Sequence, residues 1–120
     1  MIADDQEPVI NKEAALELCD DDEDIFLEIV QAYLEDALEH AKHLLYALEA
    51  GDPHEVEERA HALKGASSNI CAGPVREAAL LLERAGRSGD LSQAPQLYKV
   101  FKKEFNRLLE YLKALPPPSA

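Results

Sequence analysis

The sequence predicts an all-α protein, an antiparallel up-and-down four-helix bundle with a short additional helix at its N-terminal end. Apolar residues recur at spacings of three and four in four long segments, without the alternation typical of strands. The connections between these segments are short, which favours antiparallel neighbours. Hydrophobic residues make up 47% of the 120 residues and aromatic residues only 6%, which indicates helices that pack through aliphatic side chains.

The first part of the chain is predicted to be a flexible acidic segment, residues 1–9, followed by a short helix over residues 10–19. Asn11 is a suitable N-cap for this helix, and its apolar positions are Ala14, Ala15 and Leu18. Five acidic residues follow at positions 20–24. Their charge suits the positive N-terminal end of the next helix.

The longest predicted helix spans residues 24–50. Gly51 is expected to end it, because glycine adopts the left-handed conformation at little cost. The apolar residues of the helix recur at helical spacing and are expected to face the core: Ile25, Ile29, Tyr33, Leu34, Ala37, Leu38, Ala41, Leu44, Leu45 and Leu48.

A third helix is predicted to start at Asp52 and Pro53 and to run to about Ala72. Asp52 suits the N-cap, Pro53 the first helical position, and Glu55 the acidic position of a capping box. The stripe that we expect to face the core consists of Val56, Ala60, Leu63, Ser67 and Ile70.

Two further helices complete the predicted domain, which spans residues 10–115. One opens at Gly73-Pro74 and ends between Gly86 and Gly89; its inner face is Val75, Ala78, Ala79, Leu82 and Ala85. The other covers residues 92–115 and buries Leu97, Val100, Phe101, Phe105, Leu108 and Leu112. The Pro-rich tail, residues 116–120, cannot continue a helix.

Composition argues against several classes of function. Twenty-four acidic residues against twelve basic ones give a net charge of -12, which repels nucleic acids and anionic membranes. Cys19 and Cys71 form neither a CxxC metal motif nor a disulfide framework. The N-terminus lacks a signal-peptide pattern, and no apolar run is long enough to cross a bilayer. We therefore expect a reduced, cytoplasmic protein.

The third predicted helix contains poor helix formers, and Gly65 alone costs about 0.5–1 kcal/mol relative to alanine. A second stripe lies beside the core stripe and consists of Glu57, His61, Lys64, Gly65 and Ser68. A neutral imidazole nitrogen of His61 can attack phosphorus, and Lys64 can stabilise phosphoryl charge. Gly65 would admit a partner, and Ser68 would donate a hydrogen bond. An ordinary surface histidine and a glycine for close helix packing stay open as alternatives.

The segment Ala60-His61-Ala62-Leu63-Lys64-Gly65 resembles the signature of the histidine phosphotransfer (HPt) family. The similarity extends from about Ile10 to Leu112, and its further matches are Leu82-Glu83, Ala85, Arg87 and Gly89-Asp90. The family usually has glycine where this chain has Cys71. A cysteine adds bulk near the end of this helix, and we expect it to alter the fit of the partner.

The resemblance implies that His61 accepts a phosphoryl group from a receiver-domain aspartate and passes it to another receiver. Its partners would be response-regulator receiver domains or a hybrid sensor histidine kinase. The chain would be a phosphoryl carrier rather than an enzyme, with no cofactor or metal of its own, and Mg²⁺ would lie in the receiver. We expect a monomer, because the apolar face of each helix is buried within one bundle. Whether it is free-standing or part of a larger kinase stays open.

Two other classes of function are compatible with a helical bundle. The first is a docking module that binds a signalling partner through its helix faces without phosphoryl chemistry. The second is a di-metal carboxylate bundle, which needs two Glu-x-x-His motifs. Glu58 and His61 form one such motif, but neither His40 nor His43 has a glutamate at the required spacing. His54 lies at a helix start and has no chemical role in any of these interpretations.

Overall fold

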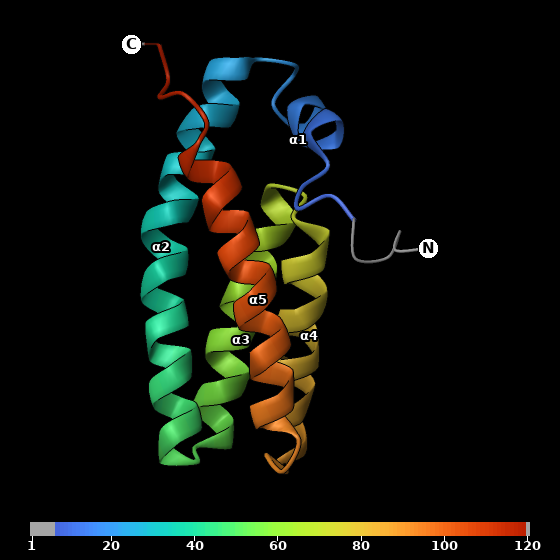
Figure 1. Ribbon diagram of the computed structural model, residues 1–120, viewed down its shortest axis with the longest axis vertical. Helices are drawn as coiled ribbons and strands as arrows, with labels where there is room; N and C mark the ends of the chain where they lie inside the picture. Colours follow the sequence, from blue (N-terminus) through green and yellow to red (C-terminus); the bar gives the residue numbers. More distant parts are fainter. Residues whose placement is uncertain (1–6, 120) are drawn as a thin grey trace.

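The computed structural model describes residues 7–119, and every regular element in this range is a helix (Figure 1). The all-α prediction is therefore confirmed. Residues 1–6 of the predicted flexible segment lie outside the described residues. The five helices are α1 (Lys12–Leu18), α2 (Glu23–Ala50), α3 (Pro53–Asn69), α4 (Gly73–Ser88) and α5 (Ala94–Lys113).

Helices α2 to α5 lie side by side, and each runs opposite to its neighbour in the chain (Figure 1). The closest packing joins α3 to α4, followed by α2 with α3 and α4 with α5. Helices α2 and α5 contact each other far less. The bundle therefore has one tight edge, between α3 and α4, and one loose edge, between α2 and α5. The short α1 contacts α2 near one end of the bundle.

The helix ends follow the local signals in the sequence. The side chains of Asn11, Asp22 and Asp52 each accept hydrogen bonds from backbone N–H groups in the first turn of α1, α2 and α3. Gly51 ends α2 with φ 66°, and Gly89 ends α4 with φ 81°. The three side-chain caps satisfy backbone N–H donors that a helix leaves free at its start. The predicted caps at Asn11 and Asp52 are confirmed.

One continuous core fills the bundle, and its largest fully buried side chains include Phe26, Phe101, Leu44, Leu63, Ile70, Leu82 and Leu108. Several residues predicted for the core are instead exposed: Leu18 (69%), Ile25 (44%), Ile29 (36%), Leu38 (45%) and Val100 (51%). At the start of α2 the buried stripe is Phe26, Leu27 and Val30. Both stripes have helical spacing, so the position of the neighbouring helices decides which one is buried.

Helix α3 ends at Asn69, three residues before the predicted Ala72. Cys71 has φ 56°, which is in the left-handed region that normally requires glycine. The N–H of Ala72 donates to the carbonyl of Ser67 (2.9 Å), and that of Cys71 to the carbonyl of Ser68 (3.0 Å). This is the Schellman pattern of helix termination, in which Cys71 occupies the position that is usually glycine.

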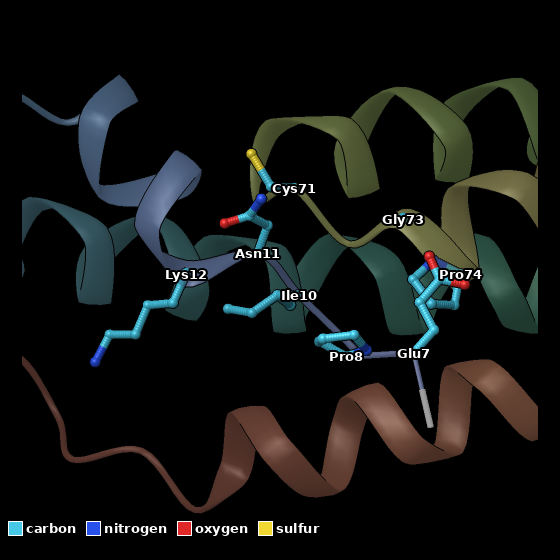
Figure 2. Close-up of a pocket in the computed structure, with 8 residues that line it drawn as sticks. All are labelled: Glu7, Pro8, Ile10, Asn11, Lys12, Cys71, Gly73 and Pro74. Carbon is cyan, nitrogen blue, oxygen red and sulfur yellow. The ribbon is translucent and has the colours of Figure 1, made fainter. Parts of the chain in front are cut away.

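Cys71 also connects α3 to the N-terminal segment. Its carbonyl accepts a hydrogen bond from the N–H of Asn11 (2.9 Å), and Figure 2 shows the two residues side by side. They line an open pocket of about 440 Å³ together with Glu7, Pro8, Ile10, Lys12, Gly73 and Pro74. The end of the His61 helix is therefore fixed to the start of α1.

The described parts of both chain ends contact the bundle. Arg107 donates to the carbonyl of Glu7 (2.9 Å), and the backbone and hydroxyl of Ser119 both donate to the carboxylate of Asp24.

Within residues 7–119, no helix has the length and apolar character needed to cross a membrane.

Candidate functional site

His61 lies on α3 at the tight edge of the bundle, with 67% of its side chain exposed. Its Nδ1 is 2.8 Å from Oε2 of Glu83 on α4. The Glu83 side chain is only 2% exposed. An exposed imidazole is thus held at one nitrogen by a buried carboxylate from the neighbouring helix.

Three cationic or potentially cationic groups surround the carboxylate of Glu83. Besides His61, Arg87 donates to Oε2 (3.1 Å) and Lys64 Nζ lies 2.8 Å from Oε1. Lys64 therefore forms an ion pair with Oε1, which has no hydrogen-bond partner among the described residues. The Nε–H of Arg87 also donates to the carboxylate of Glu57 on α3 (3.0 Å).

These partners keep Glu83 ionised. Burial alone would raise its pKa, but the hydrogen bond from His61 and the nearby charge of Lys64 outweigh that effect and lower the pKa below the usual value for glutamate. An ionised carboxylate can only accept hydrogen bonds, so Nδ1 of His61 must carry the proton in this contact. In a neutral ring, Nε2 then holds the free lone pair.

The contact between Glu83 and His61 depends on how closely α4 approaches α3. Gly86 lies one turn after Glu83 and is buried. A Cβ at this position would lie 2.6 Å from the backbone N of Glu57 and 2.6 Å from the carbonyl O of Pro53. Only glycine therefore permits this approach, which places the Glu83 carboxylate beside the His61 ring.

Gly65 lies one turn after His61, and its surroundings are open. A Cβ there would meet no atom within 4 Å beyond its own helix. The alternative that Gly65 serves close helix packing is therefore wrong. Its lack of a side chain leaves free space on the exposed face that carries His61.

The two serines of α3 have different surroundings. Ser68 is exposed, and its hydroxyl donates to the carbonyl of Lys64 (2.9 Å) on its own helix. Ser67 is fully buried and hydrogen-bonds the Tyr33 hydroxyl of α2 (2.9 Å). Burial raises the pKa of Tyr33 to about 12. Ser67 thus joins α2 to α3, as its predicted place in the core stripe requires.

Comparison with known proteins agrees with this geometry. The family model described as the Hpt domain matches residues 28–115. The chain belongs to the Hpt domain family. A search of curated proteins finds no match. The crystal structure of histidine-containing phosphotransfer protein B from Pseudomonas aeruginosa PAO1 is similar, with 29% identity and a TM-score of 0.81 over 88% of this chain and 92% of the other. A histidine phosphotransfer role in a phosphorelay is thereby supported.

Two residues of this Hpt domain were missing from the predicted site. Glu83 and Arg87 appeared in the sequence only as matches to the family and had no assigned chemistry. One signal could have identified Glu83, although the predicted inner face did not include it. Glu83 lies four residues after Ala79 of that face, and an unpaired acid beside the core is costly. The spacing of four residues between Glu83 and Arg87 allows a pair within the same helix. The pairs with His61 and Lys64 could not be read from the sequence, because these residues are on another helix.

The other histidines of the Hpt domain lie apart from this site. Nδ1 of His40 is 3.2 Å from Arg59, and the ring of His43 contacts Tyr46 edge-on. His40 and His54 line a polar hollow with Glu58. Over residues 7–119, no cluster of three His, Cys, Asp or Glu side chains is placed to hold a metal ion.

Proposed function

We propose that His61 is the phosphoacceptor of this Hpt domain and that Nε2 is the nitrogen that reacts. The observation that carries the proposal is the bond from Nδ1 to the buried carboxylate of Glu83 (2.8 Å), on a ring that is otherwise exposed. This bond holds the proton on Nδ1 and fixes the plane of the ring. Glu83 is a positioning residue, because it acts through His61 and not on the phosphoryl group.

The proposed reaction starts from the aspartyl phosphate of a receiver domain. Nε2 of His61 attacks phosphorus, the N–P bond forms, and the P–O bond to the aspartate breaks. The aspartate leaves with the electron pair as a carboxylate. The phosphorylated ring keeps its proton on Nδ1 and carries a positive charge, which lies against ionised Glu83. The reverse attack by a second receiver's aspartate regenerates neutral His61.

Three neighbours of His61 have supporting roles in the proposal. Lys64 is held 2.8 Å from Glu83 and offers its charge to the phosphoryl oxygens. Gly65 leaves free space for the partner's active site to approach. The exposed hydroxyl of Ser68 donates to its own helix, and rotation about its side-chain bond would redirect it to a phosphoryl oxygen.

The proposed partners are receiver domains of response regulators or of a hybrid sensor kinase. Such a receiver would bind Mg²⁺ and provide most of the catalysis, and the chain acts as a monomeric phosphoryl carrier. A hollow of about 130 Å³ beside the phosphoacceptor helix supports docking. It lies between α2 and α3 and is lined by Ile29, Ala32, Tyr33, Asp36, Ala66, Asn69 and Ile70.

The test is phosphoryl transfer from a panel of phosphorylated receiver domains to the wild type and to His61→Gln. We expect acid-labile, base-stable label on the wild type and none on the variant. His54→Gln is the matched control, because His54 is an exposed histidine of the same helix and should leave labelling unchanged. Equal labelling of wild type and His61→Gln would overturn the proposal. A folded wild type that binds a receiver without accepting label would favour the docking module.

A further inference from the structure

The loose edge of the bundle contains an apolar groove between α2 and α5. Two hollows of about 320 Å³ and 260 Å³ form it, and both are lined by Leu45 and Tyr98. Leu38 on the groove wall is 45% exposed. The groove follows α2 from Leu38 to Glu49, which is roughly 16 Å at a rise of 1.5 Å per residue. This length matches about three turns of a helix.

Charge along the groove differs from charge over the rest of the chain. Lys42, Lys99 and Lys102 line it, with Glu49 as its one acidic lining residue. Helix α5 carries five of the twelve basic residues of the chain but only two of its twenty-four acidic ones. Among the residues that the structure describes, neither Lys99 nor Lys102 has an acidic side chain within 4.0 Å.

The groove and His61 lie at different edges of the bundle. His61 and Glu83 join α3 to α4, whereas the groove lies between α2 and α5, on the side where α5 is in front in Figure 1. A molecule in the groove would therefore leave His61 open to a receiver. In helix-in-groove recognition an amphipathic helix lays its apolar face into a hydrophobic groove. The α2–α5 groove has such an apolar lining and adds lysines to it.

We propose that the α2–α5 groove binds an acidic amphipathic helix of a partner protein. The apolar face of that helix would cover Leu38, Leu45 and Tyr98, and its flanking carboxylates would pair with Lys99 and Lys102. A second copy of this chain is less suited, because two molecules of net charge -12 repel each other. The inference goes beyond phosphoryl transfer, since it assigns a second binding surface to a protein whose proposed chemistry is at His61.

The probe is a fluorescein-labelled synthetic helix of about 14 residues, close to four turns, with leucine at positions i, i+3, i+7 and i+11 and glutamate on both flanks. We expect saturable binding by fluorescence anisotropy that weakens with salt. A peptide with lysine in place of glutamate, and one with the leucines scattered, should both fail to bind. Binding of the lysine peptide with equal affinity would overturn the proposed charge complementarity.

Location is tested by the double variant Lys99→Glu/Lys102→Glu, which changes exposed residues and leaves the core intact. We expect it to weaken peptide binding at least about tenfold, because attraction becomes repulsion. Lys103→Glu is the matched control, since Lys103 is exposed on the same helix but lines neither hollow. The double variant should accept label at His61 as the wild type does, which separates failure here from failure of the proposed function.

Three further outcomes would overturn the inference. One is the absence of saturable binding of the acidic peptide to folded wild-type protein at millimolar concentration. Another is a dimer in sedimentation velocity that Leu38→Glu converts to monomer, which would assign the groove to a second copy of the chain. The third is unchanged affinity in Lys99→Glu/Lys102→Glu, which would reject the groove as the binding site.

Discussion

Gly65 and Gly86 both lie inside helices, two turns or fewer from the His61–Glu83 contact, yet their surroundings are opposite. A Cβ at Gly65 would meet no atom within 4 Å beyond its own helix, whereas a Cβ at Gly86 would lie 2.6 Å from two backbone atoms of α3. One glycine leaves space for another molecule, and the other lets two helices of the same molecule meet. The structural role of a glycine within a helix therefore cannot be assigned until its neighbours in space are known.

The largest effect is expected for Gly86→Ala. The added methyl group meets backbone atoms of Glu57 and Pro53, which cannot rotate away. We expect the free energy of unfolding to fall by about 2–3 kcal/mol, as for other overpacked sites, and the contact of Glu83 with His61 to loosen. Urea unfolding followed by circular dichroism measures the change. An unchanged unfolding midpoint would show that α3 and α4 pack less closely than described.

Glu83→Gln tests the carboxylate that the approach at Gly86 brings to His61. It removes a buried charge from Lys64 and Arg87, and we expect a loss of about 1–2 kcal/mol at pH 7. The folded-state pKa of Glu83 is lowered, so its contribution is present above the unfolded-state pKa and disappears as pH falls through the folded-state value.

The difference in stability between wild type and Glu83→Gln should therefore be largest near neutral pH and shrink below about pH 4. Unfolding experiments at a series of pH values measure it. Glu77→Gln is the matched control, because Glu77 is an exposed acid of the same helix and its replacement should change stability little. A difference that persists undiminished at pH 3 would contradict the role assigned to the ionised carboxylate.

Gly65→Ala should change the free energy of unfolding in the opposite direction to Gly86→Ala. The space is open, so alanine should stabilise the helix by about 0.5–1 kcal/mol. Under the proposed function, the same variant should accept label from a receiver more slowly, because its methyl group enters the space left for the partner. Higher stability combined with unchanged transfer would remove the role proposed for Gly65.

The smallest effect on stability is expected at Cys71, a non-glycine residue whose backbone has the left-handed conformation that favours glycine. Cys71→Gly should relieve the left-handed strain and stabilise the protein by about 0.5 kcal/mol, after allowance for the greater freedom of glycine in the unfolded chain. Cys71→Ser keeps the Cβ and should show no such gain. Equal stabilisation by both variants would assign the effect to the thiol rather than to φ.

The helices could be predicted from the sequence alone, because caps, glycines and apolar periodicity act over a few residues. The sequence also indicated the segment from Ala60 to Gly65 as the functional one, since poor helix formers beside a histidine and a lysine conflict with local propensity. The sequence did not determine which stripe of α2 is buried. Ile25 and Ile29 have the same spacing as Phe26 and Val30, and only the neighbouring helices distinguish them.

The partner of His61 and the roles of the two glycines depend on the tertiary structure. Glu83 and Gly86 act on α3 across a helix–helix contact, and residues more than twenty positions apart in the chain leave no periodic signal of their pairing. Local rules set which residues form each helix. The packing of one helix against another sets which carboxylate meets the imidazole, because that depends on the rotation and separation of the two helices.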